Sequence, residues 1–341
     1  MTEILARRFD AALLDLDGTV YEGDAPVPGA RPALEQAGLP MAFITNNASR
    51  APQTVADQLT GLGYDCSADD VITSAQAAIE MAAEVIPAGS AVLVLGAQPF
   101  RDLVEEAGFT VVESADDAPA AVLHGLDREM TWRRMSEGAL AIARGAVYLA
   151  SNMDTTLPTE RGLLVGNGSM IAAISSTTGV VPRSAGKPEP AMFLRAARRL
   201  AAKRPVAIGD RLDTDIRGGN AAGMATLMVV TGVSGHRDAL FAPAADRPAL
   251  IGADMSALLA PAAHAEPAPQ AGFTASPDPA DASVVVLGGG DVADPRLADP
   301  AQAAVAALLT AASVAWADGA VPVTDVRAES AAAAAAVAAW R

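Results

Sequence analysis

The stretch that decides the fold is AALLDLDGT, residues 11–19. A short apolar run that ends in polar residues predicts a buried strand, here Ala11–Leu16, with functional groups at its carboxyl end. Asp15 and Asp17 are two positions apart, so both carboxylates are expected to point the same way. Two like charges held together require a cation or a shared proton. The stretch predicts either a carboxylate site or, more simply, a solvated Asp-Gly turn.

Other apolar runs also end in polar residues. Leu39–Thr45 is followed by Asn46 and Asn47, and Val206–Gly209 is followed by Asp210. Such runs alternate with helix-like segments, which predicts an α/β protein with a Rossmann-like, doubly wound parallel sheet. A further strand is expected at Ala225–Val230, and helices are expected at Ala30–Ala37, Pro52–Leu62, Pro188–Ala202 and Thr214–Ala222.

The middle of the chain contains a second set of strands and helices, which predicts an inserted α/β domain. Its strands are expected at Ala91–Leu95, Ala120–His124 and Val147–Ala150, and its helices at Thr131–Ala143 and Ser169–Thr178. The predicted boundaries place the first part of the core at residues 1–74, the insertion at 75–180 and the second part of the core at 181–261.

The last 80 residues differ in composition from the rest. Residues 262–280 are rich in Pro, Ala and Ser without apolar periodicity, which predicts a linker. A small α/β domain of unknown role is expected at 281–341, with a strand at Ser283–Leu287 and helices near Pro300–Ala315 and Val326–Trp340. The glycines at 288–290 favour a plain turn over a phosphate cradle, because no nucleotide-binding motif surrounds them.

Composition narrows the class of protein. The 341 residues are 51% hydrophobic and 19% charged, which excludes extensive disorder. No apolar run is long enough to span a membrane and no signal peptide is evident, so a cytoplasmic location without membrane insertion is expected. One cysteine and three histidines exclude a Cys-cluster zinc site. The net charge of −16 argues against nucleic acid, and an anionic substrate would need a local cation.

Four motifs together resemble the haloacid dehalogenase (HAD) superfamily. They are DLDGTVYEG, FITNNAS, GKPEP and IGDRLDTDI, the last followed by GNAAGMATLMVVTGVS, within residues 10–260. The resemblance is to the branch with a large α/β cap, which includes NagD-like, 4-nitrophenylphosphate, phosphoglycolate and pyridoxal phosphatases. It implies a HAD core, with the insertion as the cap.

The resemblance implies a role for each motif residue. Asp15 would be the nucleophile that becomes an aspartyl-phosphate, and Asp17 the acid and base that serves the leaving alcohol and then water. Thr45 and Lys187 would hold the phosphoryl group. Asp210 would bind Mg²⁺ with the Asp15 carboxylate and the Asp17 carbonyl. Asp215 would support these metal ligands from behind.

The resemblance also bears on the substrate, a small phosphorylated metabolite. Asn46, Asn47, Asn152 and Asp154 are expected near it, although turn formation is the simpler role for the last two. Leu157 matches the leucine of phosphoglycolate phosphatase rather than the histidine of pyridoxal phosphatase. This favours an aliphatic phosphate, with glycerol 3-phosphate as the expected substrate.

Other functions stay open at this point. Phosphoglycolate, pyridoxal phosphate and nucleotides are alternative substrates. A phosphotransferase would share the aspartyl-phosphate, and a phospho-ligand sensor would not hydrolyse its ligand. A homodimer through the cap is also expected.

Overall fold

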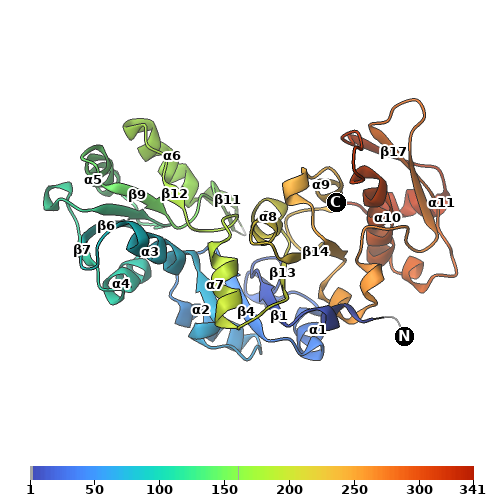
Figure 1. The fold of residues 1–341 in the computed structure, drawn as a ribbon, viewed down its shortest axis with the longest axis horizontal. Helices are drawn as coiled ribbons and strands as arrows, with labels where there is room; N and C mark the ends of the chain where they lie inside the picture. Colours follow the sequence, from blue (N-terminus) through green and yellow to red (C-terminus); the bar gives the residue numbers. More distant parts are fainter. Residues whose placement is uncertain (1–2, 160) are drawn as a thin grey trace. The chain divides into compact units, whose positions relative to one another are not determined.

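The computed structural model describes residues 3–159 and 161–341 (Figure 1). The chain divides into two compact units. Residues 1–41 and 197–341 form the first unit, and residues 42–196 form the second. The second unit contains all of residues 75–180 together with residues on both sides. The predicted cap boundaries at 75 and 180 therefore stay a prediction.

A parallel α/β layer forms the centre of the first unit. Four parallel strands pair in the order β15, β14, β13 and β1. Their nearly continuous apolar sequences are buried, as expected for parallel strands covered by helices. The layer comprises β1 (Ala11–Leu14), β13 (Pro205–Gly209), β14 (Ala225–Val229), β15 (Leu250–Gly252), α1 (Ala30–Ala37), α8 (Arg217–Ala221), α9 (His236–Leu240) and the small hairpin β2 (Tyr21–Glu22) and β3 (Ala25–Pro26).

Strand β1 is shorter than predicted. It ends at Leu14, because the carbonyl of Leu16 turns to accept the N–H groups of Thr19, Val20 and Tyr21 at 3.2, 2.9 and 3.1 Å. The N–H of Asp15 still donates to the Ile208 carbonyl at 2.9 Å, so this residue leaves the layer at the carboxyl end. The residues from Asp15 to Thr19 therefore lie on a tight turn and not on the strand itself.

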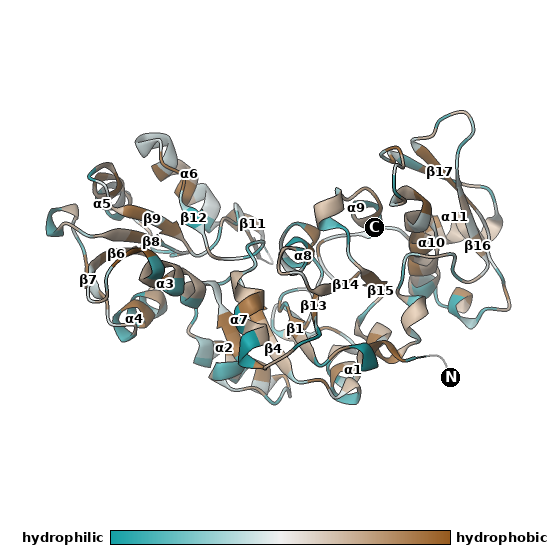
Figure 2. Ribbon diagram, in the orientation of Figure 1, coloured by the Kyte–Doolittle hydropathy of each residue, from teal (hydrophilic) through white to brown (hydrophobic). Residues whose placement is uncertain are grey.

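The second unit contains a five-stranded parallel sheet in the order β12, β9, β8, β6 and β7. Figure 2 shows brown, hydrophobic central strands, which supply much of this unit's core. The sheet and its helices comprise β6 (Ala91–Leu95), β7 (Thr110–Val112), β8 (Ala121–His124), β9 (Val147–Ala150), β12 (Arg183–Ser184), α4 (Gln98–Glu106), α5 (Trp132–Ala143) and α6 (Asn167–Thr178). The expected strands and helices of the insertion are confirmed to within two residues.

Other elements of the second unit flank this sheet in the sequence. They are the parallel pair β4 (Met41–Thr45) and β5 (Val71–Thr73), helices α2 (Pro52–Gly61), α3 (Ser74–Val85) and α7 (Ala191–Arg199), and the hairpin β10 (Thr156–Thr159) and β11 (Gly162–Val165). Helix α7 is three residues shorter at each end than predicted.

The C-terminal extension, residues 262–341, belongs to the first unit. Its buried residues join those of β14, β15 and α9 in one hydrophobic cluster, in which most residues of α10 take part. Its elements are β16 (Phe273–Pro277), β17 (Val284–Gly289), β18 (Asp325–Ala328), α10 (Pro300–Ala315) and α11 (Ala331–Ala338). The extension therefore packs on the α/β layer and shares its core.

Two predictions for the extension were wrong. The segment 262–280 is not a plain linker: it contains β16, and the ring of Phe273 is only 1% exposed. The helix expected from Val326 begins at Ala331, because Val326 instead pairs with Val285 in a parallel ladder. In residues 262–280, the Pro and Ala content gave no indication that Phe273 is buried. In the segment from Val326, the alanine-rich sequence gave no indication of a short strand before the helix.

The plain turn expected at the glycine run 288–290 was wrong for its first two residues, because Gly288 and Gly289 end strand β17 and pair with Thr274 and Phe273 of β16. The N–H groups of Gly290 and Asp291 donate to the carbonyls of Gly272 and Ala271 at 2.9 and 2.8 Å. A Cβ on Gly290 would lie 2.6 Å from the Cβ of Ala332 in α11. These contacts account for the glycines without a bound phosphate.

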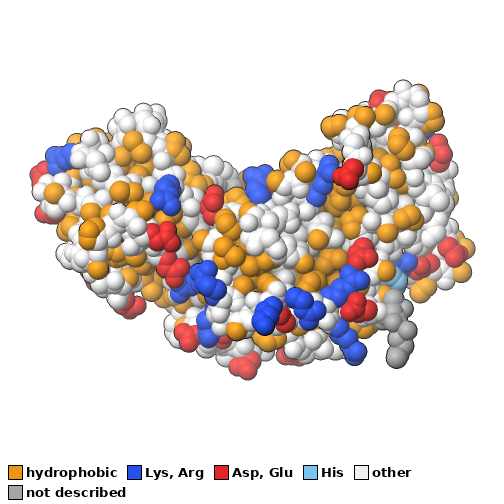
Figure 3. Space-filling model, viewed as in Figure 1, with side chains coloured by type: hydrophobic (Ala, Val, Ile, Leu, Met, Phe, Trp, Pro, Cys, Tyr) orange, Lys and Arg blue, Asp and Glu red, His pale blue; other side chains and the backbone are white. Residues whose placement is uncertain are grey.

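The described part of the chain has no helix that is both long and apolar enough to cross a membrane. On the face drawn in Figure 3, Lys and Arg side chains are interspersed with Asp and Glu side chains.

Candidate active site

Three carboxylates gather at the strand ends of the first unit. Asp15, Asp210 and Asp215 each offer one oxygen, and these oxygens lie within 4.8 Å of one another. Asp210 and Asp215 are buried and Asp15 is half-buried. Three like charges at this spacing repel strongly when little water screens them, so the group, here called the carboxylate cluster, fits a bound cation.

Hydrogen bonds and close packing fix Asp210 within the carboxylate cluster. Its Oδ1 accepts from the Thr19 hydroxyl at 3.2 Å, and its Oδ2 accepts from the N–H of Val233 at 2.5 Å. A Cβ at Gly18 would lie 2.7 Å from Oδ2, and one at Gly232 would overlap the same atom. The two glycines therefore let the main chain approach the carboxylate from two sides.

Asp215 contributes one oxygen to the carboxylate cluster and accepts hydrogen bonds from the protein. Its Oδ2 accepts from the N–H of Arg211 at 3.1 Å, and its Oδ1 accepts from the Thr214 hydroxyl at 3.4 Å. A Cβ on Gly209 would clash with its carboxylate. Protein donors fix the Asp215 carboxylate beside Asp15 and Asp210, and its expected supporting role stays a prediction.

Asp17 differs from its neighbour Asp15 in exposure. Its side chain is exposed, while Asp15 is half-buried. The N–H of Gly18 donates to the Tyr21 carbonyl at 2.8 Å, which closes the turn that carries both aspartates. An exposed carboxyl beside a half-buried one can exchange protons with solvent or substrate, as a general acid and base must.

A second polar group, here called the lysine cluster, lies in the second unit. It consists of Asn46, Asn152, Asp154 and Lys187. The Asn46 side chain accepts from the N–H of Lys187 at 2.8 Å and donates to the Lys187 carbonyl at 3.2 Å. Its amide also donates to Asp154 at 3.1 Å. Asn46 therefore joins the segment after β4, the loop after β9 and the GKPEP motif.

The ammonium of Lys187 is held in a buried position. The residue is 4% exposed, and its Nζ donates to the carbonyl of Ile44 at 3.4 Å. A Cβ at Gly186 would overlap the carbonyl oxygen of Ser151 and lie 2.7 Å from Oδ1 of Asn46. The glycine allows the close approach that brings the lysine main chain onto Asn46.

Asn152 and Asp154 form a turn that supports the lysine cluster. Asn152 is 4% exposed and donates to the Asn46 carbonyl at 2.7 Å, while its Oδ1 accepts from the Asp154 N–H at 3.2 Å. Leu157 lies on β10, half-buried and opposite Leu164. These contacts explain Asn152 as a positioning residue, and direct substrate contact by any of the three stays a prediction.

Thr45 and Asn47 are tied together locally. The Thr45 hydroxyl, on a residue that is 4% exposed, accepts from the N–H of Asn47 at 3.1 Å. Oδ1 of Asn47 accepts from the N–H and hydroxyl of Ser49 at 2.9 and 2.7 Å. The Asn47 side chain thus closes a turn, and its expected role at the substrate stays a prediction.

Sequence reasoning missed the residues that position Asp210. The Thr19 hydroxyl and the Val233 N–H, the latter in the loop Thr231–Ser234, donate to the Asp210 carboxylate. The Thr231 hydroxyl of the same loop donates to the Gly18 carbonyl at 2.6 Å. The sequence contains a pattern that could have identified the loop, because the loop follows the apolar strand β14 just as Asp210 follows β13.

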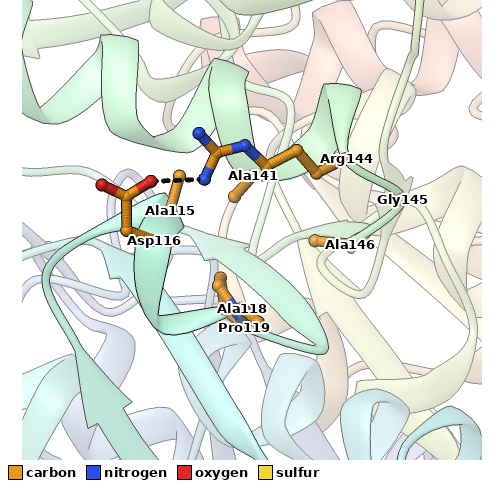
Figure 4. A pocket seen from close by; sticks show the side chains of 8 residues that line it. All are labelled: Ala115, Asp116, Ala118, Pro119, Ala141, Arg144, Gly145 and Ala146. Carbon is orange, nitrogen blue, oxygen red and sulfur yellow. Dashed lines mark hydrogen bonds and ion pairs between the residues drawn. The ribbon is translucent and has the colours of Figure 1, made fainter.

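One pocket of the second unit lies apart from the predicted residues. Its volume is about 320 Å³, and its lining includes Ala115, Asp116, Ala141 and Arg144. Figure 4 shows the Arg144 guanidinium directed at the Asp116 carboxylate, an ion pair of 2.8 Å between exposed side chains. None of the residues predicted for the active site lines this pocket.

Comparison with known proteins identifies the class. Family models described as haloacid dehalogenase-like hydrolase and HAD-hydrolase-like match residues 12–110 and 184–258. The chain belongs to the haloacid dehalogenase-like hydrolases, whose Rossmann-like α/β core the observed strands and helices form.

Two phosphatases are similar to this chain over two thirds of its length or more. The chain is 42% identical over 307 residues to the D-glycerol 3-phosphate phosphatase of Mycobacterium tuberculosis, covering 90% of this chain and 86% of the relative. It is 36% identical over 237 residues to the acid sugar phosphatase of Staphylococcus aureus, covering 68% and 90%.

Two solved structures align with different shares of this chain. The glycerol phosphate phosphatase of M. tuberculosis in complex with magnesium aligns with a TM-score of 0.90 at 38% identity, covering 100% of this chain and 99% of that one. The thermostable NPPase of Geobacillus stearothermophilus aligns with a TM-score of 0.62 at 34% identity and covers only 67% of this chain. The mycobacterial enzyme therefore shares the extension.

Proposed function

We propose that this chain is a Mg²⁺-dependent phosphatase that hydrolyses glycerol 3-phosphate to glycerol and phosphate. The observation that carries the proposal is the carboxylate cluster, whose three oxygens lie within 4.8 Å of one another on a hydrolase core. The substrate is supported by the 42% identical relative named for it and by the extension shared with that relative.

The reaction would proceed in two steps. In the first, the Asp15 carboxylate forms a bond to phosphorus while the bond to the glycerol oxygen breaks, and Asp17 gives its proton to that oxygen. In the second, Asp17 takes a proton from water, whose oxygen bonds to phosphorus and releases the Asp15 carboxylate. The covalent intermediate divides one difficult hydrolysis into two easier steps, and the exposed side chain of Asp17 suits both proton transfers.

The carboxylate cluster supplies a hard oxygen set of the kind that Mg²⁺ prefers. The residues that would hold the ion are Asp15, Asp210 and the main-chain carbonyl of Asp17, with Asp215 beside them. When bound, the ion supplies positive charge that neutralises the phosphoryl oxygens. Thr19 and Val233 orient the Asp210 carboxylate for this task.

The lysine cluster supplies the remaining charge and hydrogen bonds. Lys187 would stabilise the phosphoryl oxygens as their charge shifts in the transition state, and the Thr45 hydroxyl would donate to one of them. Asn46 would orient Lys187 through the two hydrogen bonds to its main chain. Asn47, Asn152, Asp154 and Leu157 are proposed to line the substrate side of this cluster.

A substrate panel tests the proposal. The purified chain is assayed for phosphate release with Mg²⁺ on glycerol 3-phosphate, phosphoglycolate, pyridoxal phosphate and a nucleoside monophosphate. The highest kcat/KM is expected with glycerol 3-phosphate. A higher value for another compound contradicts the substrate, and release from none of them contradicts the phosphatase.

We further infer a homodimer through the cap in the cytoplasm. Exposed apolar side chains on β11, Leu163 at 70% and Val165 at 66%, support such a contact. Light scattering on the chain and on Leu163→Glu tests the dimer: a mass that halves in the variant supports it, and a monomer in both contradicts it.

A further inference from the structure

The loop after β14, residues 230–236, connects the carboxylate cluster to the C-terminal extension. On the side of the cluster, the N–H of Val233 donates to Oδ2 of Asp210 at 2.5 Å, and the N–H of Ser234 donates to the Asp210 carbonyl at 3.0 Å. The Ser234 hydroxyl accepts from the N–H of Leu212 at 3.1 Å. The conformation of the loop therefore sets the direction of a carboxylate that is completely buried.

The opposite side of the same loop rests on the last two residues of the extension. The Arg341 guanidinium donates to the Val230 carbonyl at 2.8 Å. A Cβ at Gly235 would overlap the main-chain oxygen of Arg341, so the two main chains are in direct contact. Arg341 thus contacts the loop at both of its ends.

Trp340 fixes this contact to the core of the extension. Its ring stacks on the ring of His236 with the planes 2° apart and the centroids 6.2 Å apart. Its indole N–H donates to the Ala304 carbonyl of α10 at 3.1 Å, and the residue is 8% exposed. A continuous series of contacts therefore runs from α10 through Trp340 and the loop to Asp210.

From these contacts we infer that Trp340 and Arg341 are positioning residues for the metal site. They hold the loop that aims the Asp210 carboxylate, and their loss weakens cation binding without unfolding the chain. The inference rests on the proposed function in so far as Asp210 binds Mg²⁺. It assigns a positioning role at the metal site to the C-terminal extension.

The test measures Mg²⁺ affinity without substrate, by isothermal titration of the metal-free chain. Arg341→Ala is compared with Arg341→Lys, which can still donate to the Val230 carbonyl. Arg327→Ala is the matched control, because Arg327 forms an ion pair with Asp278 elsewhere in the extension. Melting temperatures without Mg²⁺ report the stability of each variant.

Arg341→Ala is expected to raise the Kd for Mg²⁺ about tenfold, at the low end of the effect of losing a partner behind a metal ligand. Arg341→Lys should restore part of the affinity, and Arg327→Ala should leave it unchanged. An unchanged Kd in Arg341→Ala, whether or not the melting temperature falls, overturns the inference. If the unsubstituted chain itself binds no Mg²⁺, the proposed function fails and not only this inference.

Discussion

The carboxylate cluster and the lysine cluster are both polar groups at strand ends, but they are built differently. The carboxylate cluster brings three acidic side chains within 4.8 Å, and main-chain N–H and hydroxyl groups donate to two of them. In the lysine cluster, the Asn46 amide bonds the Asp154 carboxylate and the Lys187 main chain, Asn152 donates to the Asn46 carbonyl, and the Lys187 ammonium donates to the Ile44 carbonyl. The first cluster is a set of oxygen ligands that fits a cation, whereas the second ties three segments of the second unit together.

The difference predicts a chemical role for the first cluster and a structural role for much of the second. Removing a residue from the carboxylate cluster should change metal binding and turnover, because the cluster supplies the oxygens that would hold the ion. Removing an amide from the lysine cluster should change stability as well, because the network holds three segments together. The predictions below test this division, beginning with the largest effect.

Lys187→Met should lower kcat by about 10²–10³-fold, the usual loss when a charge or donor at the transition state is removed. The effect is measured as steady-state phosphate release from glycerol 3-phosphate. The matched control is Lys203→Met, since Lys203 is the other lysine of the chain and is exposed. Equal losses in both variants would mean that the buried lysine has no special part in turnover.

Adding Mg²⁺ should stabilise the chain through the carboxylate cluster. At a concentration about 100 times the Kd, linkage gives about 2.7 kcal/mol, which is visible as a rise in Tm. Asp210→Asn should reduce that rise, since one charged ligand is lost. An equal rise in the variant would place the cation elsewhere.

Asn46→Ala should destabilise the second unit by about 1–3 kcal/mol, because the Lys187 N–H and the Asp154 carboxylate lose their partner. Urea unfolding with EDTA present measures the change. Asn47→Ala is the control, since its side chain closes only a local turn with Ser49. The Kd for Mg²⁺ should stay the same in Asn46→Ala, and a large change would break the division between the clusters.

A fall in pH should lower the stability of the second unit, because the His124 ring is buried in its neutral form. Burial lowers the pKa of this ring to about 3, with Arg134 adding to the effect, and its Nε2 has no hydrogen-bond partner. The unfolded chain takes up the proton near pH 6.5, so the neutral ring's contribution is complete above that pH and is lost as the pH falls toward 3. The loss is about 1.4 kcal/mol per pH unit.

His124→Gln should flatten this dependence in urea unfolding between pH 7 and 4.5 with EDTA present. The matched control is His264→Gln, a histidine whose pKa burial lowers less strongly. If His124→Gln and the unsubstituted chain lose stability in parallel, another group causes the acid sensitivity.

The sequence predicted the elements that have strong apolar patterns and clear ends. Helix α10 begins at Pro300 and ends at Ala315 as expected, and β6 and β9 also agree residue for residue. Polar residues after apolar strands located Asp15 and Asp210, because the strand ends of a parallel sheet converge. Lys187 was found because lysine is rare in this chain and stands before a proline in a recognisable motif.

The rest depends on contacts that no local pattern encodes. Asn46 could cap a helix, form a turn or bind substrate, and only the folded chain shows its amide joining Lys187 to Asp154. Phe273 lies in a Pro- and Ala-rich segment, so its burial follows from long-range packing. The loop at 230–236 has no charged residue before His236, yet its N–H groups position Asp210.

The most direct test of the central claim is phosphate release from glycerol 3-phosphate by Asp15→Asn. The matched control is Asp213→Asn, because Asp213 is an exposed carboxylate that forms an ion pair with Arg211, two residues away. Asp15→Asn should lose at least about 10⁴-fold in kcat, as expected when a nucleophile is removed, while its Tm without Mg²⁺ does not fall. Turnover by Asp15→Asn at a rate close to that of Asp213→Asn would contradict the account.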